Sequence, residues 1–462
     1  MAKLWDKGYS LDRLVEAFTV GDDPALDTRL VNADCVASLA HASMLASIGV
    51  LKETERAALA RGLSEIIDAN ERGEFPIRAS DEDVHTAIEN RLVQTVGDPG
   101  KRIHTGRSRN DQVLTAIRLW SRGFLLAFLR ESVALAARLL DFAEENSAIP
   151  MPGRTHLQIA MPSSVGLWAA AYAEELLEDV ALGRAAFTVT DSCPLGSAAS
   201  YGVPLPLDRE MVARLLGFGR VQNNVLAANN SRGRHEAVVL GAAEQVAQTL
   251  SKMAQDLILF SLPELGYFTI PQELCSGSSI MPQKRNPDGL ELIRARSAAV
   301  SADLTSIKNV IRALPSGYNR DFQETKGPFF RGCEAALGCV RVMRLTVDRL
   351  GVNEPKLRAA FTPDIFATDR ALELVAGGMP FREAYREVGR SLQELRDRDP
   401  DAALKLRTST GTPGNLRLDV PRADAEAAGA YLDREESTKR DALIALVGRA
   451  VTLFRDPLSV HL

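Results

Sequence analysis

The sequence is poor in the residues that covalent cross-links and zinc sites require. It contains five cysteines in 462 residues, an odd number, and none of them forms a CxxC pair. Neither a disulfide framework nor a zinc site is therefore indicated, and we expect buried, reduced thiols. The cysteines are Cys35, Cys193, Cys275, Cys333 and Cys339.

Long apolar runs and an excess of one charge are also missing. The N-terminal stretch MAKLWDKGYSLDRL carries charges where a signal peptide needs an apolar segment. No stretch approaches the roughly 18 uninterrupted apolar residues of a membrane span. The net charge is −5, which provides no broad basic face for nucleic acid. We therefore expect a cytoplasmic protein that binds neither membranes nor nucleic acid.

Proline is missing from two long stretches, between Pro99 and Pro150 and between Pro206 and Pro263. Because proline breaks helices, long helices can form there. Apolar residues recur on one helical face of each stretch, as expected for a bundle. A helix of some 30 residues is about 45 Å long, which suggests a bundle that also builds an oligomer. The two apolar faces consist of Ile117, Trp120, Phe124 and Phe128, and of Val239, Val246, Leu250, Met253, Leu257 and Phe260.

The rest of the chain reads as shorter helices. No alternating run is strong enough to predict an extensive sheet, and Asp27–Gly49 and Glu53–Arg72 have helical patterns. The stretch TGTPGNLRLDVPR (410–422) is typical of a connection between short helices. The prediction is an all-α protein with an N-terminal helical domain (1–106), a central long-helix bundle (107–355) and a C-terminal helical domain (356–462).

Familiar catalytic motifs are absent. There is no GxSxG, no HExxH and no complete GxGxxG, and the residues around Gly100–Lys101 do not form a phosphate loop. These absences weaken nucleotide-cofactor and zinc-hydrolase interpretations. Four dense polar stretches remain: HTGRSRNDQ (104–112), PGRTHLQIAMP (152–162), GSSIMPQKRNPD (277–288) and SGYNRDFQETK (316–326).

The first two stretches contain a candidate anion-binding helix start and a histidine. Arg109 and Asn110 stand immediately before a helical pattern, where Ser108 or Asn110 can serve as N-cap. A helix start beside two arginines can also bind a carboxylate. His156 lies between Thr155 and Gln158, and on its own it would more often be structural than catalytic.

The third stretch begins with Gly277 and contains Ser278, Lys284 and Asn286. Serine is a poor base unless backbone amides and a cation stabilise its alkoxide, and this loop can provide both. We expect the loop to bury its middle residues, Ile280–Met281, which have no reason to be exposed.

The residues that follow offer further polar groups. Glu291 falls in a helical segment, where it can orient a histidine or pair with Arg294 or Arg296. The fourth stretch offers Tyr318, Gln323 and Lys326, and alone it would be an ordinary polar loop.

Taken together, the four stretches resemble the fumarase/aspartase superfamily, and within it most closely the argininosuccinate lyases. GSSIMPQKRNPD is similar to the mobile signature loop of the superfamily. HTGRSRNDQ and ATDRALELVAGGMPFREAYREVG (367–389) are similar to argininosuccinate lyases in particular. The resemblance implies an all-α fold whose central bundle assembles into a twenty-helix homotetramer core, with each site shared between three subunits.

The resemblance also implies roles for single residues. Ser278 would be the general base that removes a proton beside the succinyl carboxylate, and the C–N bond then breaks to give fumarate and arginine, a step of arginine biosynthesis. His156 would be the acid at the leaving nitrogen or an orienting group, with Glu291 as its partner. No metal and no redox cofactor are implied. Substrate binding would fall to Arg109, Asn110, Thr155, Lys284, Asn286, Tyr318, Gln323 and Lys326.

Three departures from the family pattern leave other substrates open. Arg154 stands where argininosuccinate lyases usually have tyrosine, PLGSAASYG (194–202) replaces a GAGALAG-like run, and FTVGDD (18–23) lacks a serine. The alternative is a lyase for another N-substituted aspartate, such as adenylosuccinate or a diamine succinate. RSRND argues against fumarase and aspartase, and PFREA against adenylosuccinate lyase. A non-catalytic, crystallin-like structural protein is the third interpretation, and the complete catalytic set argues against it.

Overall fold

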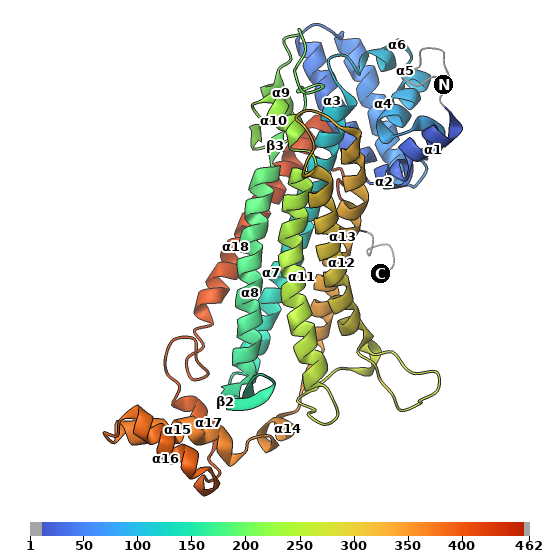
Figure 1. Cartoon of the computed structure of the whole chain (residues 1–462). Helices are drawn as coiled ribbons and strands as arrows, with labels where there is room; N and C mark the ends of the chain where they lie inside the picture. Colours follow the sequence, from blue (N-terminus) through green and yellow to red (C-terminus); the bar gives the residue numbers. More distant parts are fainter. Residues whose placement is uncertain (1–11, 457–462) are drawn as a thin grey trace.

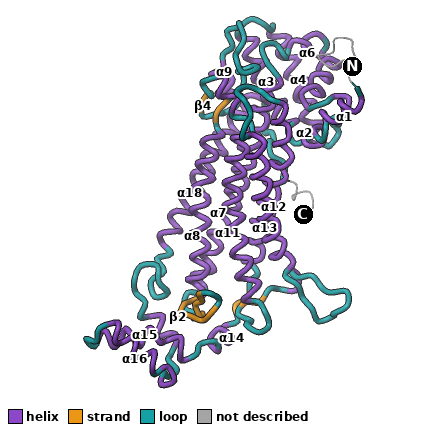
Figure 2. The backbone as a smooth tube through the Cα atoms, in the orientation of Figure 1, coloured by secondary structure: helices purple, strands orange, loops and turns teal. Residues whose placement is uncertain are grey.

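An elongated, mostly helical molecule is formed by residues 12–456, which the computed structural model describes (Figure 1, Figure 2). Long helices lie side by side at its centre, which confirms the predicted all-α class. The prediction drawn from the N-terminal stretch falls largely on residues 1–11, outside the described part. The bundle helices are α7 (Arg109–Glu145), α8 (Val165–Thr190), α11 (Arg234–Phe260), α12 (Asp288–Ile311) and α13 (Lys326–Asp348).

The apolar faces predicted from the sequence form the core of this bundle. The six residues of the α11 face are buried, from 0% exposed at Val239 to 6% at Phe260. On α7, the ring of Trp120 lies 5.6 Å from that of Phe124 and 4.7 Å from that of Phe330 on α13. Burial of such a side chain contributes about 1.5–3 kcal/mol. The bundle is therefore a well-packed scaffold that fixes the distance between the features at its two ends.

A group of shorter helices covers one end of the bundle (Figure 1). The predicted helix at Glu53–Arg72 is confirmed, whereas the one at Asp27–Gly49 begins four residues late, at Val31. The difference arises because Asp27 ends a separate helix and its carboxylate accepts the Val84 N–H. The elements are α1 (Arg13–Val20), α2 (Asp23–Asp27), α3 (Val31–Ser47), α4 (Glu53–Glu71), η1 (Ala79–Asp81), α5 (Val84–Val96) and α6 (Asp98–Arg102).

Strands occur only as short pairs among the described residues, consistent with a sequence in which no alternating run predicts an extensive sheet. β1 and β2 form an antiparallel hairpin, β3 and β4 a parallel pair, and β5 and β6 an antiparallel pair. The strands are β1 (Pro150–Thr155), β2 (Gln158–Ser164), β3 (Ser192–Cys193), β4 (Arg220–Val221), β5 (Phe268–Thr269) and β6 (Gly351–Val352). The short helices between them are α9 (Arg209–Leu215), α10 (Val225–Asn230), η2 (Gln272–Leu274) and η3 (Arg320–Thr325).

The C-terminal part divides between the far end of the bundle and its side (Figure 1). Its last long helix starts inside 410–422, at Asp419, and packs against α7 and α8. The expectation of a connection between short helices is thus wrong on its C-terminal side. Pro421 falls in the first turn, where no helical N–H partner is lost. The elements are α14 (Glu354–Ala359), η4 (Pro363–Phe366), α15 (Ala367–Ala376), α16 (Phe381–Arg390), η5 (Leu392–Glu394), α17 (Pro400–Lys405) and α18 (Asp419–Val447). The domain boundaries at 106 and 355 stay predictions.

The five cysteines are all free thiols, and four of them are buried as expected. Cys275 is the exception, since it is only half-buried. Within residues 12–456, none of the helices is both long and apolar enough to cross a membrane.

Candidate functional site

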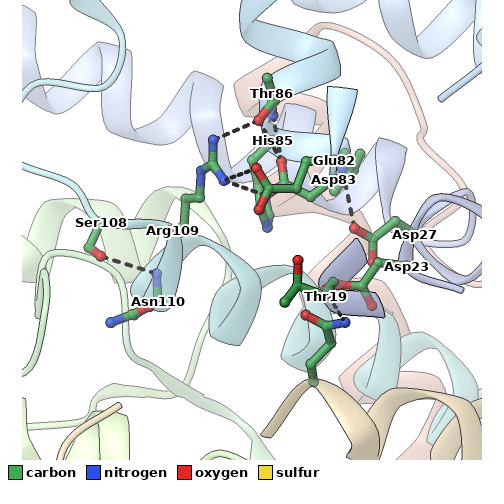
Figure 3. Close-up of polar contacts among 12 residues, drawn as sticks. Thr19, Asp23, Asp27, Glu82, Asp83, His85, Thr86, Ser108, Arg109 and Asn110 are labelled. Atoms are coloured by element: carbon green, nitrogen blue, oxygen red, sulfur yellow. Dashed lines mark hydrogen bonds and ion pairs between the residues drawn. The ribbon is translucent and has the colours of Figure 1, made fainter. Parts of the chain in front are cut away.

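A polar pocket lies where α7 and α13 begin, against the N-terminal helices (Figure 3). Five of the residues predicted to bind substrate line it: Arg109, Asn110, Tyr318, Gln323 and Lys326. They come from two of the four polar stretches, which are some 200 residues apart in the sequence. The fold therefore brings together side chains that sequence proximity could not connect. The pocket is also lined by Asp23, Asp27, Glu82, Asp83, His85, Val113, Arg232 and Arg320.

The start of α7 is fixed by a capping box. Ser108, one of the two predicted candidates, is the N-cap: its hydroxyl accepts the Asn110 N–H at 3.3 Å, and its own N–H donates to Asp111 Oδ1 at 3.0 Å. The other oxygen of Asp111 accepts the N–H groups of Gly196 at 3.0 Å and Ala198 at 2.8 Å. The 194–202 stretch is thus tied to the end of α7 that presents Asn110.

Arg109 faces the acidic side of the pocket (Figure 3). Its guanidinium donates to Thr86 Oγ1 at 2.8 Å and lies 3.1 Å from an Asp83 oxygen and 3.5 Å from a Glu82 oxygen. These contacts position the side chain of Arg109. Because it remains a quarter exposed, it still reaches the pocket.

Lys326, the first residue of α13, is buried between two carboxylates. Its Nζ lies 2.7 Å from Asp23 Oδ1 and 2.8 Å from Asp27 Oδ1. These acids offset the unfavourable position of a cation at a helix N-terminus. Burial, together with the nearby Asp27, raises the pKa of Asp23 to about 6, although Lys326 opposes the shift. In the single chain, Lys326 is therefore engaged by the protein's own acids.

A buried histidine in the pocket wall escaped the sequence interpretation. His85 Nδ1 lies 3.1 Å from Asp34 Oδ2, and both side chains are almost fully buried. Burial alone would lower the pKa of His85, but the charges of Asp34, Asp83 and Asp27 raise it. The signal available was the run EDVH (82–85) directly before a helical pattern. The acidic lining from Asp23 to Asp83 was missed as well, because its partners in space, such as Lys326, are distant in the sequence.

The remaining predicted residues lie at the far end of the bundle (Figure 1). Thr155 and His156 are at the tip of the β1–β2 hairpin, and both are exposed. Glu291 is exposed in the first turn of α12. Within residues 12–456, no hydrogen bond or ion pair joins Glu291 to His156, nor to Arg294 or Arg296, so its predicted partnership stays a prediction.

The loop with Ser278, Lys284 and Asn286 also lies at this end. Two backbone hydrogen bonds between Ser276 and Asn286, of 3.0 and 2.9 Å, close its base. The Ser278 hydroxyl accepts the Met281 N–H at 3.1 Å. The expectation that the loop buries its middle is wrong for this chain, because Ile280 is 83% exposed and Met281 39%.

The two groups of residues cannot meet within one chain. Glu291 lies in the first turn of α12, whereas Lys326 begins α13 beyond the other end of α12, and a helix of 24 residues is about 36 Å long at 1.5 Å per residue. We call the predicted residues in the pocket the pocket half-site, and those at the far end, on the separate hairpin, loop and α12 start, the loop half-site. The pocket half-site is Arg109, Asn110, Tyr318, Gln323 and Lys326, and the loop half-site is Thr155, His156, Ser278, Lys284, Asn286 and Glu291.

Comparison with known proteins places the chain among the lyases. Residues 8–301 match the family model described as Lyase. The argininosuccinate lyase of Sorangium cellulosum is 49% identical over 417 residues, 90% of this chain and 97% of that protein. The argininosuccinate lyase of Thermotoga neapolitana is 42% identical over 395 residues, 86% of this chain and 99% of that protein.

Two solved structures share the fold. One is EDDS lyase in complex with formate, with a TM-score of 0.81 and 23% identity over 94% of each chain. The other is class II fumarase from Schistosoma mansoni, with a TM-score of 0.69 and 19% identity over 84% of this chain and 94% of that one. At these identities the likeness concerns the fold alone.

Proposed function

The chain belongs to the argininosuccinate lyase family, and from this premise we propose that it is a carbon–nitrogen lyase that cleaves argininosuccinate into fumarate and arginine, a step of arginine biosynthesis. The observation that carries the proposal is the mixed charge of the pocket half-site. Its basic groups, such as Arg109, complement the carboxylates of argininosuccinate, and its acidic groups, such as Asp83, complement the cationic arginine end.

The reaction is a proton abstraction followed by elimination. Ser278, as alkoxide, takes the proton from the carbon beside the succinyl carboxylate, and the electron pair moves into that carboxylate. The pair then returns to form the double bond of fumarate while the C–N bond breaks. His156 acts at the leaving nitrogen with Glu291 as its partner, so that arginine departs protonated.

The remaining predicted residues bind and orient the substrate. Arg109, Asn110, Thr155, Lys284 and Asn286 hold its carboxylates, whose charge grows during proton removal. Tyr318, Gln323 and Lys326 contact the rest of the molecule. Tyr318 is 43% exposed, and the Gln323 amide donates to the Thr19 carbonyl at 3.0 Å. Groups preorganised in this way stabilise the transition state more than the ground state.

The complete site requires more than one copy of the chain. Its two half-sites lie toward opposite ends of α12, a helix about 36 Å long, and within residues 12–456 the Ser278 loop leaves Ile280 and Met281 exposed. A cytoplasmic homotetramer in which three subunits contribute to each site brings the half-sites together. The long helices α8, α11 and α12 lie side by side along the bundle (Figure 1), where they can pack against the helices of other copies.

The test is a comparison of substrates by fumarate release, followed by ultraviolet absorbance. The purified protein is offered argininosuccinate, adenylosuccinate, malate, aspartate and a diamine succinate in parallel. We expect kcat/KM for argininosuccinate to exceed that for each of the others by about 10³-fold or more, as for a site that pairs buried polar groups with its substrate. A higher kcat/KM for another succinyl amine would keep the lyase chemistry and reject the substrate.

A further inference from the structure

The hairpin that carries His156 turns in a backbone conformation that L residues rarely adopt. Thr155 of β1 pairs with Gln158 of β2, so only His156 and Leu157 form the turn. Their φ angles are +53° and +63°, a positive pair that is typical of a type I′ turn and that Asn-Gly usually supplies. Neither residue here is glycine, so other contacts must hold the turn.

Arg154 makes the contacts that tie this turn to the bundle. Its Nη1 donates to the Leu157 carbonyl oxygen at 2.8 Å, and its Nη2 donates to the Tyr267 hydroxyl at 3.1 Å. Tyr267 is a firm anchor, because it is 1% exposed and its ring lies 5.8 Å from that of Phe260 at the end of α11. One guanidinium therefore bridges the turn and the core.

The strands are shaped to direct Arg154 into this position. The β1–β2 register shifts between Pro152 and Arg154, at Gly153. A Cβ at Gly153 would lie 2.9 Å from the Met161 carbonyl oxygen, so the bulge needs glycine. At the tip, Leu157 is 67% exposed, so burial of its own side chain does little to fix the turn.

We propose that Arg154 is a positioning residue that fixes the His156–Leu157 turn and thereby orients the His156 imidazole for reaction. The inference rests on the proposed function, in which His156 acts at the leaving nitrogen. Arg154 binds the backbone of the turn and not the reacting atoms. It also gives a physical role to the arginine that departs from the family pattern at this position.

The test replaces Arg154 in the full-length protein. We expect Arg154→Met to lower kcat about 10- to 100-fold with KM changed less than about 3-fold, because a small misplacement of a reacting group costs rate rather than binding. Arg154→Lys retains one donor and should recover part of kcat. The matched control is Arg184→Met, which removes an arginine stacked 4.3 Å from the ring of Tyr431, away from the hairpin.

Two further readouts separate positioning from general destabilisation. Leu157→Gly removes the cost of the positive φ, so the double variant Arg154→Met/Leu157→Gly should regain several-fold in kcat over Arg154→Met. Deuterium uptake at residues 155–160 should be about 10-fold faster in Arg154→Met, with uptake in α11 unchanged. Unchanged uptake at the turn, together with kcat within about 2-fold of wild type, would overturn the proposal. If wild-type protein does not cleave argininosuccinate, the proposed function fails, while deuterium uptake still decides whether Arg154 holds the turn.

Discussion

Ser278→Ala is expected to lower kcat by about 10³-fold or more, because the proposed mechanism assigns proton abstraction to the Ser278 hydroxyl and alanine has no group to replace it. We expect this substitution to change the stability of the fold little. The Ser278 hydroxyl accepts only local backbone hydrogen bonds, from the Ile280 and Met281 N–H groups, and the base of the loop is closed by Ser276 and Asn286. Steady-state turnover of argininosuccinate measures the effect, and size-exclusion chromatography checks that the assembly is unchanged.

The adjacent serine supplies a matched control. Ser279 is exposed in the same loop, so Ser279→Ala changes the loop equally in size and should leave kcat within about 3-fold of wild type. If Ser278→Ala instead keeps near-normal turnover, serine is not the base. If both variants lose activity equally, the loop and not the Ser278 hydroxyl is responsible.

Lys326→Met is expected to destabilise the protein by about 3–5 kcal/mol, because it leaves two buried carboxylates without their cation. Asp27 is 0% exposed and Asp23 9%, and both lie within 2.8 Å of Lys326 Nζ. Urea unfolding of the variant and of wild type measures the loss. Lys308→Met is the control, since Lys308 is exposed in the last turn of α12.

The loss of stability in Lys326→Met should increase as the pH rises. The pKa of Asp23 is already raised to about 6, and removal of Lys326 raises it further, because the lysine charge favours the ionised acid. Below these pKa values Asp23 binds a proton in the folded variant and needs no cation. The destabilisation should therefore be larger at pH 8 than at pH 5. A loss no greater than that of Lys308→Met, or one independent of pH, would contradict the buried ion pair.

Much of the fold could be predicted from the sequence, because long helices have a clear periodicity. The apolar faces of α7 and α11 and the missing prolines located the bundle correctly. Helix starts were harder: α3 begins at Val31 because a side-chain contact of Asp27 ends the preceding helix, and α18 begins inside a stretch read as a loop. Such boundaries depend on tertiary contacts that local sequence does not encode.

The candidate site could be predicted only in part, because it too depends on contacts between residues that are distant in the sequence. Arg109, Asn110 and Lys326 stood in dense polar stretches, and the fold places them in one pocket. His85 and Asp23 were missed because their neighbours in space, Asp34 and Lys326, are distant in the sequence. The roles of the eleven predicted residues stay a proposal. Ile280 and Met281 show most clearly what a single sequence does not reveal. They are exposed in one chain, as expected of a surface that only another copy covers.

The most direct test of the shared site is the mixing of two inactive variants, one from each half-site. Asn110→Leu alters the pocket half-site and Ser278→Ala the loop half-site. If each site takes these residues from different copies, random mixed tetramers should recover up to about one quarter of wild-type activity on argininosuccinate. His156→Asn mixed with Ser278→Ala should recover activity as well if three copies contribute. Absence of recovery in verified mixed tetramers would contradict a site assembled between subunits.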